Sequence, residues 1–227
     1  MKPEGAELAV LSVGEAMVEL SASATPDLWH QGFAGDTLNT AWYLRRLLPP
    51  EQAVGYLTRV GQGGFSRRMV DFIAGAGIVN DHIGTDPARE VGLYAIDLTN
   101  GERSFTYWRS ASAARGLADD AGELSRAFAR ARVIYLSGIT TAILPPEGRE
   151  TLALALAQAR DRSSSRQAAG RFITAARRRA ASRGWSAPPP WTPRRRATAS
   201  TRAILRQGFR AEASRRPSAR AMPSPCG

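Results

Sequence analysis

Residues 8–15 read LAVLSVGE, a mostly apolar stretch that ends in a glycine and a glutamate. An apolar run of strand length favours a strand buried on both faces, as in a parallel sheet covered by helices. Residues 54–60 and 133–137 show the same kind of run further along the chain. The three segments predict a parallel β-sheet at the centre of the fold.

Amphipathic helical patterns separate and follow these strands. They occupy residues 36–48, 65–73, 117–128 and 147–158, where apolar side chains recur every three or four positions. Asp36 can cap the first of these helices, and Pro49-Pro50 stops it. Strands and helices in alternation indicate an α/β fold.

A β-hairpin interrupts this alternation. Residues 91–98 and 103–109 are strand-like and flank Thr99-Asn100-Gly101-Glu102. Asn-Gly between two such runs is a strong hairpin signal, because a type I′ turn needs positive φ at both central residues. The hairpin therefore predicts a β-appendage on the α/β domain.

The net charge of +11 is concentrated at the C-terminal end of the chain. Residues 161–227 contain 16 arginines and 2 acidic residues, whereas residues 1–160 contain 15 basic and 18 acidic residues. Arg, Ala, Ser and Pro account for 46 of the last 67 residues. So few apolar side chains cannot offset a backbone entropy loss of about 1–2 kcal/mol per residue. We therefore expect one domain over residues 1–160 and a disordered tail over residues 161–227.

Several classes of protein are disfavoured. No run approaches the ~20 apolar residues that a membrane-spanning helix needs, and residues 8–13 are too few for the core of a signal peptide. A lone cysteine, Cys226, excludes an intrachain disulfide, so we expect a cytoplasmic protein without a membrane partner. His30 and His82 lack further residues at metal-ligand spacing, which predicts no metal site.

Polar residues that follow the apolar runs are the candidates for ligand binding, because ligands of open α/β sheets lie beyond the carboxyl ends of the strands. Gly14-Glu15, Gly35-Asp36 and Ser137-Gly138 stand at such positions. Asp36 and Asn39 lie on one face of a helix start, where a carboxylate and a carboxamide can bind adjacent hydroxyls of a sugar. The alternative is that Asp36 is only the helix N-cap.

Five motifs, in the right order, resemble the ribokinase-like (pfkB-type) carbohydrate kinases. They are GEAMVEL at residues 14–20, AGDTLNTA at 34–41, TRVG at 58–61, VGLY at 91–94 and FTYWRSASA at 105–113. The second and the last are most similar to those of kinases acting on 2-keto-3-deoxygluconate. The resemblance spans residues 8–160 and implies a doubly wound parallel sheet with a small β-hairpin lid.

The resemblance also implies roles for six residues. The expected substrate-binding residues are Gly35, Asp36, Asn39, Tyr94, Tyr107 and Arg109. The first three would bind sugar hydroxyls, and the others would lie on the lid, with Glu19 nearby. Arg109 would pair with the carboxylate of an acid sugar, for which a neutral sugar has no counterpart. The alternative is that Tyr107 is an ordinary strand aromatic and Arg109 a solvated edge charge.

Two motifs that the family uses for catalysis are absent from the sequence. Neither a Gly-Ala-Gly-Asp run, which carries the base and the anion hole, nor an Asp-x-Asn-x-Arg segment occurs. Gly61-Gln62-Gly63-Gly64 precedes a helix but lacks the Lys-Ser/Thr of a Walker phosphate loop. The resemblance implies ATP and Mg²⁺ for the family, yet we expect this chain to be truncated and inactive. The composition of its tail is typical of out-of-frame translation.

Two further expectations concern partners. A lid of this family could support a homo-oligomer. A different class of function is a non-catalytic protein whose arginine-rich tail binds RNA or another anion by counterion release. Only four aromatic residues, two Phe and two Trp, interrupt the tail, too few for a periodic base-stacking platform, so nucleic acid is the less favoured partner.

Overall fold

Strand β1 (Val10–Val13) lies in the middle of a five-stranded parallel sheet. The computed structural model describes residues 7–25, 27–99, 102–165 and 171–175. The sheet has the order β5-β4-β1-β8-β9, with β4 at Val54–Val60, β5 at Val79–Thr85, β8 at Val133–Ser137 and β9 at Arg171–Ala175. All four pairings are parallel, which confirms the central sheet expected from the apolar runs.

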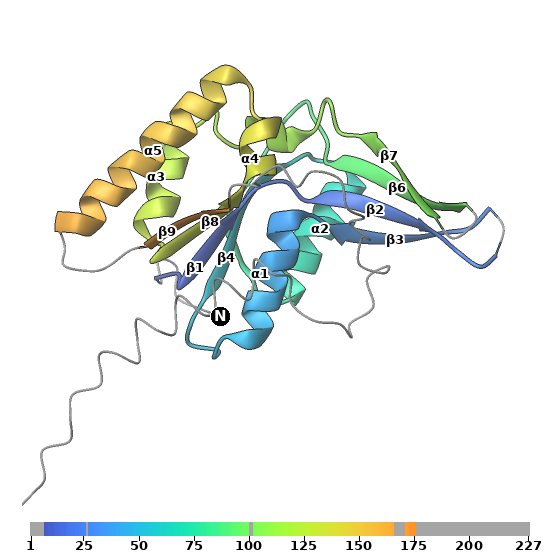
Figure 1. Ribbon diagram of the computed structural model, residues 1–227, viewed down its shortest axis with the longest axis horizontal. Helices are drawn as coiled ribbons and strands as arrows, with labels where there is room; N and C mark the ends of the chain where they lie inside the picture. The colour runs from blue at the N-terminus through green and yellow to red at the C-terminus, as the bar shows by residue number, and fades with distance from the viewer. Residues whose placement is uncertain (1–6, 26, 100–101, 166–170, 176–227) are drawn as a thin grey trace, which may run out of the picture.

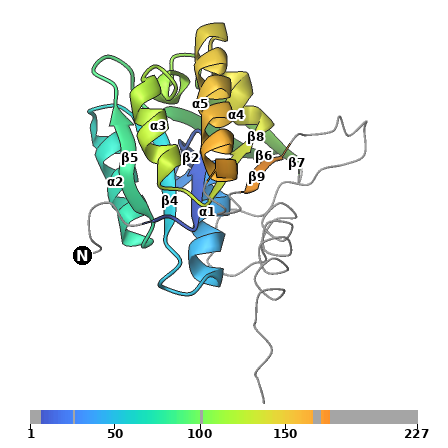
Figure 2. The same cartoon turned by 90° about the vertical axis from the view of Figure 1, so that its left-hand side faces the viewer.

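Helices cover both faces of this sheet (Figures 1 and 2). One face carries α1 (Asp36–Leu47) and α2 (Gly64–Gly75), and the other carries α3 (Ala121–Ala129) and α5 (Pro146–Ser165). Successive side chains of a strand point to opposite faces, so Val10 packs with the α1 side while Leu11 and Val13 pack with the α3 side. Because both faces of the strand are covered by helices, nearly every side chain in it must be apolar. The expected doubly wound α/β fold is confirmed.

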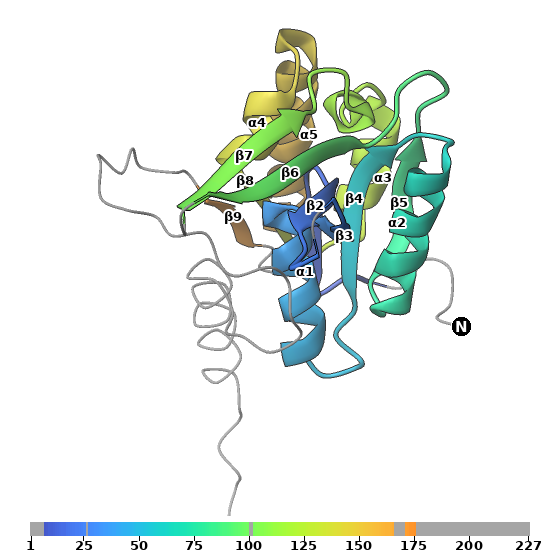
Figure 3. The same ribbon diagram turned by 90° about the vertical axis from the view of Figure 1, so that its right-hand side faces the viewer.

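A second sheet of four strands extends from one end of the core (Figures 1 and 3). Its order is β3-β2-β6-β7, with β2 at Met17–Ala22, β3 at Trp29–Ala34, β6 at Gly92–Thr99 and β7 at Glu102–Trp108. We call it the lid sheet. The expected hairpin is its β6–β7 half, and the lid is thus larger than a hairpin; the expected Asn100-Gly101 turn lies outside the described residues.

Several elements begin elsewhere than the residue pattern predicted. The N-cap of α1 is Gly35, not Asp36, and no side chain caps this helix. Helix α3 begins at Ala121, where the Asp120 carboxylate accepts hydrogen bonds from two backbone amides, and a 3₁₀ turn at Ala113–Gly116 precedes it. Strands β2, β3 and β5 and the short helix α4 (Gly138–Ile143) were not predicted.

The boundary at residue 160 needs correction. Helix α5 continues to Ser165, and β9 pairs with β8 in parallel register, Ile173 opposite Tyr135. Arg171–Ala175 reads RFITA, in which Phe, Ile and Thr all favour strands, so ten residues of the expected disordered tail have regular structure. The rest of the tail lies outside the described residues. No helix within the described ranges is long and apolar enough to cross a lipid bilayer.

Candidate functional site

A polar pocket lies where β1 and β8 end and α1 begins. This is the carboxyl edge of the parallel sheet, the position at which ligands of α/β folds are expected. Its lining residues come from the turn after β1, the start of α1, the end of β7 and the start of α4: Glu15, Met17, Gly35, Asp36, Thr37, Arg109, Ser137, Ile139 and Thr140. The pocket therefore opens between the core sheet and the lid sheet.

The floor of the pocket is held by buried hydroxyl groups. Ser12 Oγ donates to the carbonyl of Thr37 at 2.8 Å, and the Tyr56 hydroxyl donates to the carbonyl of Gly14 at 3.1 Å. Thr140 Oγ1 donates to the carbonyl of Val13 at 2.9 Å. These bonds tie the turn after β1 to α1, β4 and α4, and buried bonds of this kind fix one local geometry.

Gly35 allows the backbone of α1 to approach the turn after β1. A Cβ atom at this position would lie 2.3 Å from the carbonyl oxygen of Glu15. No side chain can be accommodated there without moving the backbone, so glycine is required for the helix to start beside the pocket. This close approach explains why the motif at residues 34–39 has a glycine before Asp36.

Asp36 is the first residue of α1 and is exposed at the pocket. Its carboxylate makes no capping hydrogen bond, and it forms no ion pair with another described residue. The alternative that Asp36 acts only as an N-cap is therefore wrong. Asn39 lies one turn further along α1, half-buried, and does not line the pocket.

Arg109 reaches the pocket from the residue after β7. Its Nη2 donates to Oε2 of Glu15, and the two side chains form an ion pair that joins the lid sheet to the turn after β1. The Glu15 side chain is 2% exposed and that of Arg109 is 26% exposed. Burial raises the pKa of the Glu15 carboxyl, although the Ser112 hydroxyl and the Arg109 guanidinium act to lower it. Arg109 is thus not a solvated edge charge.

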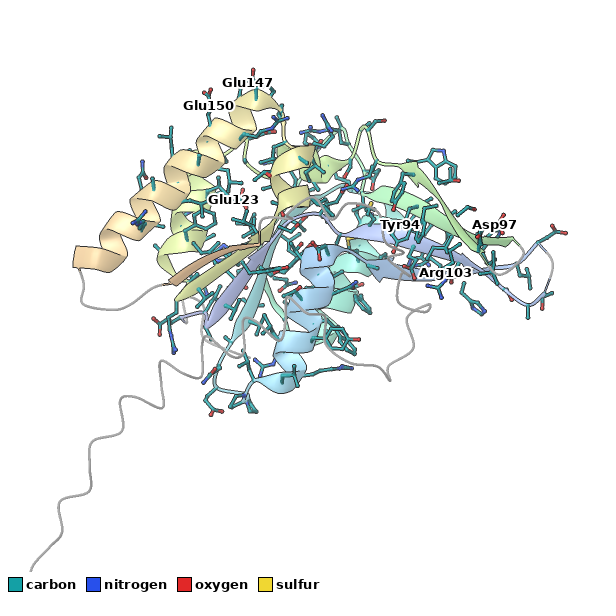
Figure 4. All side chains as sticks on the ribbon, in the orientation of Figure 1. Tyr94, Asp97, Arg103, Glu123, Glu147 and Glu150 are labelled. Atoms are coloured by element: carbon teal, nitrogen blue, oxygen red, sulfur yellow. The ribbon has the colours of Figure 1, made fainter. Side chains whose placement is uncertain are left out.

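Tyr94 and Tyr107 face each other across β6 and β7 (Figure 4 labels Tyr94). Their rings are 5.6 Å apart, and the Tyr94 hydroxyl donates to the Glu19 carboxylate on β2. Tyr94 is buried and Tyr107 is exposed. Neither lines the pocket, so the structure brings together Gly35, Asp36 and Arg109 of the six expected residues and places the others beside it.

Sequence reasoning gave no role to four polar residues of the pocket, of which Thr37 was quoted only within a motif. Glu15 and Ser137 were noted because they follow apolar runs but were given no role, and Thr140 was not noted at all. The signal for Glu15 was its position directly after the central strand. Thr140 carries no such signal, because α4 was not predicted and its hydroxyl reaches the pocket through tertiary packing.

The backbone amides of the glycine-rich loop at residues 61–64 already bind a carboxylate of the protein, that of Glu90. Glu90 Oε1 accepts hydrogen bonds from the backbone amides of Gln62 and Gly63 at 3.1 and 2.6 Å, and Oε2 accepts one from Ser66 Oγ at 2.7 Å. The Ser66 bond, followed by the amides, lowers the pKa of the Glu90 carboxyl against the effect of burial. This loop is therefore closed to a nucleotide phosphate.

The described residues do not fit ATP or Mg²⁺. The loop that could have held a phosphate is filled by Glu90. Across the described ranges, no three residues among His, Cys, Asp and Glu cluster in a way that could hold a metal ion. The arrangement fits a small polyhydroxylated ligand with a negative charge better than a nucleotide, because the pocket offers two carboxylates, three hydroxyls and one guanidinium.

A doubly wound parallel sheet with a pocket at its carboxyl edge, beneath a lid sheet, defines the class of this chain as an α/β fold. The chain matches the pfkB family of carbohydrate kinases over residues 8–181. It belongs to this family, and the resemblance seen in the motifs is confirmed.

Relatives named 2-dehydro-3-deoxygluconokinase are similar to this chain. The one from Haemophilus influenzae is 38% identical and the one from Dickeya dadantii 41% identical, each over 144 residues that cover 62% of this chain and 46% of the relative. The chain thus spans about half the length of these curated relatives. The structure of a PfkB protein from Polaromonas sp. JS666 matches 76% of this chain and 56% of its own, with 26% identity and a TM-score of 0.58.

Proposed function

We propose that this domain binds 2-keto-3-deoxygluconate, also called 2-dehydro-3-deoxygluconate, in the pocket between the core sheet and the lid sheet. The whole kinase would transfer the γ-phosphoryl group of ATP to a hydroxyl of this sugar. The observation that carries the proposal is a partly buried guanidinium, Arg109, in a pocket whose other polar lining residues carry carboxylate or hydroxyl groups, beside the apolar side chains of Met17 and Ile139. A guanidinium pairs with a carboxylate through two parallel hydrogen bonds, which selects an acid sugar.

The hydroxyls of the sugar would be bound by α1. Asp36 has a carboxylate without a side-chain partner among the described residues at the start of the helix, and Gly35 lets a ligand approach the backbone there. Asn39 would add a carboxamide on the same face of the helix. The names of the relatives, which share 37–41% identity over this region, support this choice of sugar.

The lid sheet would close over the bound sugar. Tyr94 and Tyr107 lie beside the pocket and do not line it, so their proposed contacts require the lid sheet to move toward α1. The Tyr94 hydroxyl donates its hydrogen to Glu19, which leaves its oxygen lone pairs to accept a hydrogen bond from a sugar hydroxyl.

ATP and Mg²⁺ are proposed for the whole kinase from the family alone. Because the described residues do not fit either group, no step of phosphoryl transfer is assigned to them. What this domain would contribute is the binding and orientation of the acceptor sugar, which is a large part of catalysis in phosphoryl transfer.

Direct binding tests the proposal. The 227-residue chain is titrated with 2-keto-3-deoxygluconate and with fructose, a neutral ketose, by isothermal titration calorimetry. We expect the acid sugar to bind at least tenfold more tightly than fructose. Equal affinities would contradict the choice of an acid sugar, and no binding of either would contradict the sugar site itself.

A further inference from the structure

The Glu15–Arg109 ion pair connects the two sheets beside the pocket. Glu15 stands in the turn between β1 of the core sheet and β2 of the lid sheet, and Arg109 is the residue after β7. The two residues are 94 positions apart in the chain, so only the tertiary fold brings them together.

Glu15 is the fixed member of the pair. Its side chain is almost fully buried, its backbone carbonyl lies against Gly35, and its carboxylate lies against Gly92, where a Cβ atom would be 2.9 Å from Oε1. Arg109 has a long side chain with many rotamers and is a quarter exposed. The contact therefore restricts the arginine far more than it restricts the glutamate.

Stability does not account for Glu15. Its Oε1 is buried and makes no hydrogen bond of normal length and angle to a described residue, although the Ser112 hydroxyl is near enough to lower the pKa of the carboxyl. A buried carboxylate oxygen without a partner lowers the free energy of unfolding, because its interaction with water is lost and not replaced.

The guanidinium retains donors for a ligand. Its recorded hydrogen bond to Glu15 uses Nη2, and an arginine side chain has five N–H donors on three nitrogens. Nη1 and Nε can therefore bind a second carboxylate while Nη2 remains on Glu15. One guanidinium shared by two carboxylates stays where the first of them holds it.

We infer that Glu15 is a positioning residue: its buried carboxylate holds the Arg109 guanidinium at the pocket before the sugar arrives, so that Arg109 selects an acid sugar without first having to be ordered. The inference rests on the proposed function. Repulsion between the Glu15 carboxylate and the carboxylate of the sugar acts in the opposite direction. Removing Glu15 weakens sugar binding if the ordering of Arg109 is the larger effect, and strengthens it if the repulsion is larger.

Binding to Glu15 variants provides the test. Glu15→Ala removes the contact, Glu15→Gln keeps an oxygen acceptor for Nη2, and Asp81→Asn breaks a carboxylate–arginine pair outside the pocket, with Arg130. We expect Glu15→Ala to weaken binding of 2-keto-3-deoxygluconate about tenfold, which corresponds to about 1.4 kcal/mol. We expect Glu15→Gln to recover at least half of that loss in free energy, and Asp81→Asn and the affinity for fructose to stay unchanged.

Three results would overturn the inference. They are acid-sugar binding by Glu15→Ala that is as tight as in the wild type or tighter, equal losses for both sugars, and a Glu15→Gln variant no better than Glu15→Ala. The first would mean that repulsion dominates, and the second that Glu15 only supports the pocket structurally.

A measurement without sugar separates this inference from the proposed function. In ¹⁵N-arginine-labelled protein, a held guanidinium rotates slowly and shows separate Nη signals, whereas a mobile one shows an averaged signal. We expect separate Arg109 signals, assigned by their loss in Arg109→Lys, in the wild type and in Asp81→Asn but not in Glu15→Ala. Averaged signals in the wild type would overturn the inference, whatever sugar the pocket binds.

Discussion

The first residue of α1 shows how a small shift in a helix boundary changes the meaning of a side chain. If Asp36 were the N-cap, its carboxylate would accept hydrogen bonds from backbone amides of the helix. Because Asp36 is instead the first helical residue after Gly35, its carboxylate is available at the pocket. We expect Asp36→Ala to weaken binding of acid and neutral sugars alike, because both have hydroxyls for the carboxylate to bind. The expected loss is about tenfold, which is the size of the contribution of one hydrogen bond to a charged group. Calorimetric titration of both sugars measures this.

The matched control for Asp36→Ala is Asp120→Ala. Asp120 is a true N-cap, which accepts from the amides of Gly122 and Glu123 at 2.8 and 3.0 Å. Asp120→Ala should lower the melting temperature and leave sugar binding unchanged. Asp36→Ala should weaken sugar binding and leave the melting temperature unchanged. A clear loss of stability in Asp36→Ala would mean that its carboxylate supports the helix after all.

Arg109→Ala tests the choice of an acid sugar. Breaking a charge-assisted contact in a partly buried site typically costs about 2–5 kcal/mol, part of which is the penalty of leaving the other charge unpaired. Arg109→Ala should therefore raise the Kd for 2-keto-3-deoxygluconate at least tenfold and change the Kd for fructose little. Equal changes for the two sugars would remove the main physical support for an acid substrate.

His82 links stability to pH. It is buried on β5, where burial, and then the neighbouring Arg130 guanidinium, lower its pKa. The unfolded chain takes up a proton at this residue near pH 6.5, about the ordinary pKa of histidine, and the folded protein only at lower pH. The free energy of unfolding should therefore fall as the pH drops below about 6.5, and level off below the folded pKa.

Urea unfolding of the wild type and of His82→Gln between pH 7.5 and pH 5 measures this contribution. Other groups also titrate in this range, so the comparison is the difference between the two proteins at each pH. We expect the advantage of the wild type to shrink as the pH is lowered. A difference that stays constant across the range would show that His82 is protonated equally in both states.

Among the secondary-structure elements, those with a clear residue pattern of their own could be predicted from the sequence, and those with a mixed pattern could not. Strands β4 and β8 agree residue for residue with the apolar runs, because both are buried on both faces. Strands β2 and β3 were missed because the lid sheet is partly exposed and its side chains are mixed. The lid hairpin was recognised from its turn chemistry, whereas β2 and β3 pair with each other across a connection without such a turn signal, and β2 joins the hairpin through β6, which is distant in the chain.

The lid sheet also presents apolar side chains to solvent. Leu98, Phe105 and Tyr107 are exposed on the face that carries Tyr94, as their register shows. Exposed apolar clusters of this kind favour protein–protein contact, and we propose that two copies of the chain associate through this face. The double variant Leu98→Glu/Phe105→Glu should then sediment as a monomer where the wild type sediments as a dimer. A wild-type monomer would contradict the proposal.

For the whole molecule, the class of fold followed from the alternation of strands and helices, but the pocket did not. Gly35 and Asp36 could be placed from their position at the start of a predicted helix, and Arg109 from the resemblance to the family. The partner of Arg109, the buried Glu15, is recognisable only in three dimensions, since between them the chain runs through two lid strands, returns to the core sheet for β4 and β5, and passes back to the lid sheet. Function in this domain thus depends on where the two sheets meet.

We expect this chain to bind the sugar without phosphorylating it. Phosphoryl transfer depends on groups that position the phosphates and stabilise their charge, and on a base near the attacking hydroxyl. The sequence has no Gly-Ala-Gly-Asp run to supply the base and anion hole, and the glycine-rich loop at residues 61–64 is filled by Glu90. We therefore expect the 227-residue chain to bind 2-keto-3-deoxygluconate yet release no ADP above the buffer rate in a coupled assay with ATP and Mg²⁺. ADP release that depends on the acid sugar and disappears in Asp36→Ala would show that this chain completes the active site by means its sequence motifs do not reveal.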